Sequence, residues 1–166
     1  ILAECIRDDG QNFGKTSTRL TSIVPAGKMN PLMGICDHVS KNYGSSKDKY
    51  QMAKDAGINS IRDEIRWTEF EKVEGVFEPD VHTKRYLDFT NETGQRKFAI
   101  LGYYMPGRTQ KGLPRTPADM AEFKVYVENV LRQTKDMKID FELWNEQNMH
   151  VGDEFGQIED YVNLAK

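Results

Sequence analysis

The sequence predicts an α/β fold with a parallel sheet, preceded by a short β region. Three observations support this prediction. Short apolar runs alternate with amphipathic stretches from residue 31 onward, glycine or proline separates the two kinds of segment, and residues 1–30 lack this alternation. Strands that alternate with helices along a chain pair in parallel and are joined by right-handed crossovers.

Residues 1–30 have the pattern of strands without helices. Two short apolar-rich runs, Ile1–Arg7 and Thr18–Val24, flank the turn-forming stretch Asp8–Gly14. This arrangement predicts a β-hairpin or two strands, either as an N-terminal hairpin or as part of an accessory domain. Pro25-Ala26-Gly27 then interrupts the pattern before the first unit of the α/β region.

Residues 31–166 contain four strand–helix units. The expected strands are Leu32–Cys36, Ile58–Ile65, Lys97–Tyr103 and Ile139–Trp144. The first two expected helices run from Ser45 or Ser46 to Ala56 and over Asp80–Thr93. The third begins at Thr116, and its apolar face consists of Met120, Phe123, Val127, Val130 and Leu131. The fourth is indicated by the helical spacing of Ile158, Tyr161, Val162 and Ala165. Gly57 and Gly94 are expected to end the first two helices, and Thr116 with Pro117 to begin the third.

The order of the units and the long loops after the strands are typical of a (β/α)₈ TIM barrel. Such a barrel needs about eight units and about 250 residues. We therefore expect residues 31–166 to form the N-terminal half of a barrel, with the chain a fragment or its remaining half supplied by a partner chain. A small complete α/β fold of four strands is the alternative.

Composition narrows the classes of function. The net charge is −3 and no basic run appears. The sequence therefore lacks the basic surface that binding to nucleic acid or to an anionic membrane requires. No apolar run approaches the roughly 20 residues that span a bilayer. We expect no cofactor and no metal, because no His/Cys/Asp cluster has ligand spacing and no phosphate-binding glycine loop is present. Cys5 and Cys36 are expected to be buried thiols, with a disulfide bridge between them as the alternative.

The segment Phe141–Asn148 carries the chemistry. Here an apolar strand ends in Trp144-Asn145-Glu146, at the barrel face where catalytic groups lie. Cleavage of a glycosidic bond needs two carboxyl groups, one of them protonated so that it can give a proton to the leaving oxygen. Burial against an aromatic ring raises the pKa of such a group, and Trp144 is the expected ring. Asn145 is expected to bond a sugar hydroxyl beside the reacting carbon.

Two motifs resemble the clan A retaining glycoside hydrolases. The fourth strand of that clan ends in Asn-Glu, often within Trp-Asn-Glu-Pro-Asn, and this chain reads Trp-Asn-Glu-Gln-Asn with Gln147 in the place of proline. Gly57-Ile58-Asn59-Ser60-Ile61-Arg62, followed by Trp67, is similar to the clan's Gly-x-Asn-x-x-Arg strand. The resemblance covers residues 31 to about 160 and is nearest the β-xylosidase-like and cellulase/mannanase-like members. Between the two motifs, only the pattern of strands and helices matches.

The resemblance implies a retaining glycoside hydrolase that acts on β-linked poly- or oligosaccharide. Glu146 would be the acid/base, and Arg62 would hydrogen-bond the nucleophile and keep it ionised. The nucleophile would end strand seven, beyond Lys166, so the isolated chain is expected to be inactive. Glu64 is expected to pair with Arg62 or Arg66 rather than act in catalysis. The resemblance also implies secretion or another extracytoplasmic location, although no signal peptide is visible.

Four further residues are candidates for sugar binding. His38 follows the first strand and is either a sugar ligand or a solvent-facing histidine. Tyr103 and Tyr104 end the third strand, where one ring would stack on a sugar or pack in the core. Trp67 would line the sugar site or cover the rim of the barrel, and His82 is expected to be solvated. A non-catalytic carbohydrate-binding protein and a half-barrel interaction module remain as alternatives to an enzyme.

Overall fold

The chain forms one two-stranded and one four-stranded sheet in its computed structural model, which describes residues 2–6, 12–17, 25–38, 46–147 and 156–166. Strands β3 (Asn30–Cys36), β4 (Ile58–Arg66), β5 (Arg96–Gly102) and β6 (Ile139–Leu143) lie side by side in the order of the sequence. All three pairings between them are parallel. The parallel sheet expected from the alternating pattern is confirmed.

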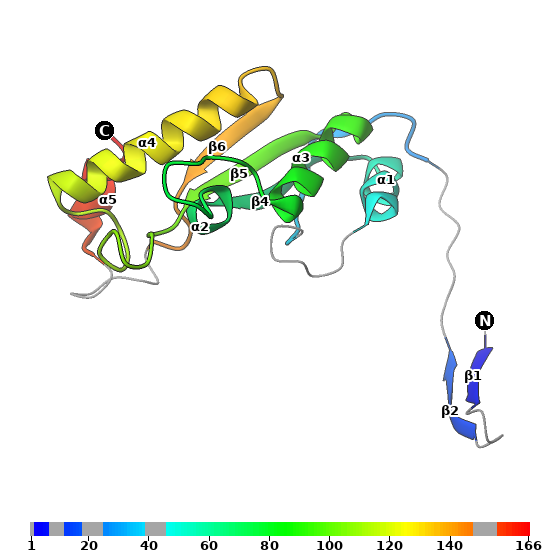
Figure 1. Ribbon diagram of the computed structural model, residues 1–166. Helices are drawn as coiled ribbons and strands as arrows, with labels where there is room; N and C mark the ends of the chain where they lie inside the picture. Colours follow the sequence, from blue (N-terminus) through cyan, green and yellow to red (C-terminus); the bar gives the residue numbers. More distant parts are fainter. Residues whose placement is uncertain (1, 7–11, 18–24, 39–45, 148–155) are drawn as a thin grey trace.

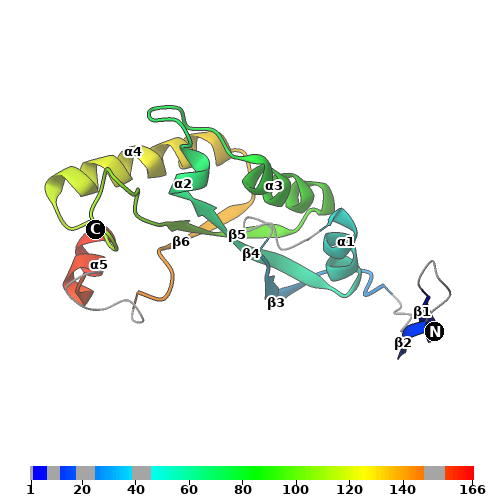
Figure 2. The same cartoon turned by 60° about the horizontal axis from the view of Figure 1, so that its bottom comes forward.

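The helices are α1 (Lys47–Asp55), α2 (Trp67–Phe70), α3 (Val81–Thr93), α4 (Pro117–Thr134) and α5 (Ile158–Leu164). Helices α1, α3 and α4 lie on one face of the curled sheet (Figure 1; Figure 2). Right-handed crossovers between strands in sequential order place every crossover helix on the same face. The arrangement is that of a partial TIM barrel, as expected. No described helix has both the length and the apolar character that a membrane span requires.

The N-terminal region contains a hairpin, as expected, but its second strand lies earlier than the sequence indicated. β1 (Leu2–Ile6) pairs antiparallel with β2 (Asn12–Ser17), with Leu2 opposite Ser17 and an irregularity after Cys5. Residues 12–14 were expected in the turn but belong to β2. The polar residues and the glycine there are compatible with backbone pairing to β1. The expected strand Thr18–Val24 lies outside the described residues.

Local capping signals set the helix ends. Asp80 accepts a hydrogen bond from the Thr83 N–H at 2.8 Å to begin α3, and Gly94 ends it with a φ of 73°. Thr116 and Asp119 form a reciprocal capping box at the start of α4. Ser46 stands at the N-cap of α1, but its side chain makes no capping hydrogen bond.

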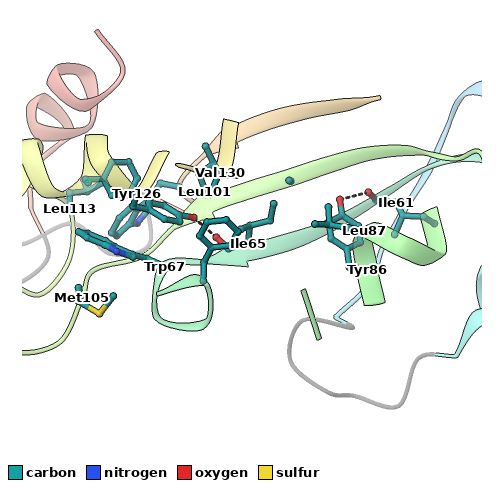
Figure 3. Packing of buried hydrophobic residues seen from close by; sticks show 14 of the residues in the cluster. Ile61, Ile65, Trp67, Tyr86, Leu87, Leu101, Met105, Leu113, Tyr126 and Val130 are labelled. Atoms are coloured by element: carbon teal, nitrogen blue, oxygen red, sulfur yellow. Dashed lines mark hydrogen bonds between the residues drawn. The ribbon is translucent and has the colours of Figure 1, made fainter. Parts of the chain in front are cut away.

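The core fills the space between the helices and the sheet. Trp67 stacks on Tyr126 with centroids 5.4 Å apart, and Phe123 packs edge-on against Trp67 at 5.8 Å. Such ring pairs contribute about 0.5–1.5 kcal/mol each beyond the area that they bury. The buried Tyr126 and Tyr86 hydroxyls donate to the carbonyls of Ile65 and Ile61, which joins the helix layer to β4 (Figure 3).

Two details of the helix layer differ from the sequence prediction. The expected face of α4 is rotated, so that Tyr126 is wholly buried while Leu131 is 44% exposed. Tyr126 lies three residues after Phe123 and four before Val130, so it belongs to their face of the helix, although the sequence prediction did not include it. The long loop expected after the strand Ile58–Ile65 begins with the single helical turn α2.

The face of the sheet opposite the helices, here called the inner face, is partly open. Leu32 is 92% exposed and Phe98 is 38% exposed on it. The apolar run 98–101 of the expected strand Lys97–Tyr103 is typical of a strand covered on both faces, and this interpretation is wrong for Phe98. The expectation of a buried thiol is also wrong for Cys36, which is exposed. Cys36 and Phe98 both lie on the inner face, level with Arg62 in the register of the sheet. Cys5 lies in β1, where side chains are not described.

Candidate functional site

The parallel sheet brings the two sequence motifs to the same edge. Strand β5 separates β4 from β6, with Arg62 opposite Phe98 and Phe98 opposite Asp140 in register. Side chains alternate between the two faces of a strand, so Arg62, Glu64 and Arg66 share the inner face. Glu142 shares that face on β6. The carboxyl ends of barrel strands are where active sites are built.

Arg62 links these elements directly. Its Nε and Nη2 donate to the two carboxylate oxygens of Glu142 at 2.8 and 2.9 Å, and Nη2 also donates to Asn145 Oδ1 at 2.7 Å. Nη1 donates to Cys36 Sγ at 3.4 Å. The hydrogen bond to Glu142 is the main reason why the pKa of Arg62 is raised above its ordinary value. The structure thus brings together two of the candidate residues, Arg62 and Asn145.

Strand β6 is followed by a left-handed turn. Trp144 N still donates to Leu101 O at 2.9 Å, but the backbone then takes positive φ values of 64° at Trp144 and 50° at Glu146. Side chains disfavour this region, at a cost of about 1–3 kcal/mol for each residue, and it recurs at functional sites. Glu146 follows the carboxyl end of a parallel strand, as the sequence predicted, and is exposed. Asn148, the last residue of the motif, lies outside the described residues.

Trp144 lies in the core. Its side chain is 3% exposed, with its ring 5.3 Å from that of Tyr103 and 6.3 Å from that of Phe123. An apolar wall that Trp144 supplies to Glu146 is therefore not seen in this structure. The indole supports the turn from the helix side, and little of its surface is left to meet a sugar.

A second ion pair lies one step further along β4. Arg66 Nε donates to Glu64 Oε2 at 2.5 Å, and the Tyr103 hydroxyl donates to Glu64 Oε1 at 3.3 Å. The Arg66 guanidinium also lies 5.8 Å from the centre of the Tyr103 ring. Burial and the neighbouring Glu64 carboxylate raise the pKa of Tyr103. Of the two pairings expected for Glu64, the structure has the one with Arg66, and it brings Tyr103 into the same cluster.

Trp67 is placed apart from this cluster. Its side chain has no exposed surface, and its indole Nε1 donates to Glu71 at 2.6 Å beneath α4. The ring is part of the core and cannot meet a sugar in this conformation. The alternative in which Trp67 covers the end of the barrel fits this position, and the one in which it lines the sugar site does not.

The remaining candidates have intermediate positions. His38 is half-buried directly after β3, with its N–H donating to Asp37 Oδ1 at 2.8 Å. Tyr104 is half-buried and packs on the core. His82 was expected to be solvated, but it is half-buried on α3. Within the described ranges, no group of three His, Cys, Asp or Glu side chains is arranged to hold a metal ion.

Sequence reasoning missed Glu142. The signal was present, since two carboxylates, Asp140 and Glu142, alternate with apolar residues along β6, which places both on one face of the sheet. A charged residue at such a position requires a counter-ion when it is partly buried. Both side chains of the pair are 30% exposed.

A buried carboxylate also fixes the loops beside this edge. Glu71, whose side chain is 0% exposed, accepts from Gly75 N at 2.7 Å and from Arg108 Nη1 at 2.6 Å, besides Trp67. Burial by itself would raise the pKa of Glu71, but the hydrogen bonds from Gly75, Arg108 and Trp67 lower it below its ordinary value. Arg108 also pairs with Glu122 of α4. The loops after β4 and β5 are thereby joined.

Comparison with known proteins supports the fold. No protein-family model and no curated protein matches this chain. Among solved structures, it is similar to a family 39 glycoside hydrolase from the gut symbiont Bacteroides cellulosilyticus WH2, with a TM-score of 0.68 and 18% identity. The match covers 95% of this chain and 32% of that chain. The chain thus has the fold of part of a TIM barrel, as the resemblance of the two motifs implied.

Proposed function

We propose that this chain contributes the acid/base half of a retaining glycoside hydrolase active site. The observation that carries the proposal is the position of Glu146, directly after the fourth parallel strand and next to an Asn145 that Arg62 holds at 2.7 Å. In this mechanism a second carboxylate attacks the anomeric carbon while Glu146 gives its proton to the leaving oxygen. Glu146, then a carboxylate, takes a proton from the water that releases the sugar.

The second carboxylate would come from strands that complete the barrel, either in the same protein or in a partner chain. The term "completed barrel" is used below for this chain together with those strands. The proposed substrate is a β-linked poly- or oligosaccharide. Because a polysaccharide does not cross a membrane, we further propose that the protein acts outside the cytoplasm.

The leaving-group dependence of a Glu146→Gln variant of the completed barrel tests this proposal. Glutamine has nearly the same shape but no proton to give, so hydrolysis of an alkyl glycoside should fall by about 100- to 10,000-fold. Formation of the intermediate from a dinitrophenyl glycoside should be nearly unchanged, since that leaving group needs no proton. Glu159→Gln, at an exposed position on α5, is the matched control and should behave like the wild type. Equal losses on both substrates would refute an acid role for Glu146.

A further inference from the structure

The ion pair between Arg62 and Glu142 differs from another pair on the same strand. Asp140, two residues before Glu142, pairs with Arg96 at the opposite end of the sheet, where the two side chains are 37% and 57% exposed. The pair of Arg62 and Glu142 is less exposed and reaches across β5 to a residue 80 positions away. It also has a third member, Asn145, that the Arg96 pair lacks.

The donors of Arg62 are almost fully used. A guanidinium carries five N–H groups in a fixed plane. Four of them are directed at Glu142, Asn145 and Cys36. Because the plane is rigid, the bidentate contact with Glu142 sets the direction of the N–H that meets Asn145. Among the described residues, one N–H on Nη1 has no acceptor, so it is available to a group from outside them.

The contact with Arg62 also determines which end of the Asn145 amide meets a ligand. Since Oδ1 accepts from Arg62, the remaining hydrogen-bonding group of the amide is its NH₂, which can only donate. A donor at this position selects a ligand that offers an oxygen acceptor, such as a hydroxyl oxygen on the carbon next to the reacting carbon.

We propose that Glu142 is a positioning residue, which holds Arg62 so that the Asn145 amide presents its NH₂ to the sugar. This inference rests on the proposed function for the identity of the ligand as a sugar. The claim that Glu142 orients Arg62, and Arg62 the Asn145 amide, does not depend on that function. Loss of the Glu142 charge frees the Arg62 plane to rotate, and the Asn145 amide then loses its fixed orientation. In this proposal Glu142 acts on the sugar through Arg62 and Asn145 rather than by contact of its own.

A double-mutant cycle in the completed barrel tests this. Glu142→Gln should lower kcat/KM for an aryl β-glycoside by about 10- to 100-fold, as a misplaced binding group does. It should change kcat/KM less than about threefold for the analogue that lacks the hydroxyl next to the reacting carbon. Added to Asn145→Ala, Glu142→Gln should cause no further loss. Asp140→Asn, the same chemical change in the other ion pair, should leave kcat/KM unchanged. Additive losses, or equal losses on both substrates, would overturn the proposal.

A nuclear magnetic resonance measurement on the same proteins separates this proposal from the function on which it rests. The Arg62 Nε–H should exchange with water at least about tenfold faster in Glu142→Gln, and the Asn145 side-chain NH₂ signals should shift. If the variant leaves both signals as in the wild type, Glu142 does not position Asn145, whatever the activity. If the wild-type barrel hydrolyses no glycoside but the signals change as expected, the proposed function fails and the positioning role holds.

Discussion

Arg62 and Glu142 are joined by two hydrogen bonds of 2.8 and 2.9 Å, although 80 residues separate them in the sequence. The pair connects β4 to β6 across β5, on the inner face of the sheet. Glu142 lies three residues before Asn145, which Arg62 also contacts. The strand that carries the proposed acid/base is therefore fixed to the strand that carries the second motif.

Substitution of Arg62 should destabilise the protein more than substitution of Arg96. Arg62→Ala leaves the Glu142 carboxylate, 30% exposed, without its bidentate partner, so we expect a loss of about 1–2 kcal/mol in the free energy of unfolding. Arg96→Ala removes a more exposed ion pair, which solvent screens more strongly, and should lower the free energy of unfolding less. Urea denaturation followed by circular dichroism gives both values. An equal effect of the two substitutions would mean that the Arg62 pair is no stronger than a surface pair.

Substitution of Trp67 should affect stability rather than sugar recognition. Trp67→Phe removes the indole N–H that Glu71 accepts and part of a ring that stacks on Tyr126, so unfolding should become easier by about 1–3 kcal/mol. KM for a glycoside should not change at temperatures well below the unfolding transition. A large rise in KM with unchanged stability would contradict the core position of Trp67 and restore it as a sugar-binding residue.

Glu71 should make stability depend on pH on the acidic side. Its pKa in the folded state is lowered below 4.5, its ordinary value, so the folded state favours the charged carboxylate. The contribution is fully present above the unfolded-state pKa and is lost as pH falls through the folded-state pKa. Wild type should therefore exceed Glu71→Gln in stability at pH 7, and the difference should shrink as pH falls below about 4.5. A difference that stays constant from pH 7 to pH 3 in chemical denaturation would argue against this.

The alternation of strands and helices could be predicted because it depends on residues that are close together in the sequence. Gly94 and the Thr116–Asp119 box mark helix ends through bonds within three or four residues, and they fall where the sequence indicated. Glu146 could be placed after a parallel strand for the same reason. The second strand of the hairpin was misplaced, because its pairing depends on a partner strand rather than on its own composition.

What could not be predicted depends on contacts between distant segments. The choice of Arg66 over Arg62 as the partner of Glu64 follows from Glu142, which occupies Arg62 from two strands away. Trp67 and Trp144 are aromatic residues at strand ends, a position that fits either a core or a sugar site. The contacts made in the fold assign both rings to the core: Phe123 packs against both, Tyr126 stacks on Trp67, and Tyr103 packs edge-on against Trp144.

Chemical rescue of Glu146→Ala in the completed barrel tests the central claim most directly. In the double-displacement mechanism, Glu146→Ala should still form the covalent sugar–enzyme intermediate from a dinitrophenyl glycoside. The intermediate should then accumulate, because no base activates water. Azide needs no base, so adding it should raise turnover by about 10-fold or more and give the β-glycosyl azide, with the anomeric configuration of the substrate, in the proton spectrum. No acceleration by azide, or an α-glycosyl azide, would contradict the assignment of Glu146 as the acid/base of a retaining enzyme.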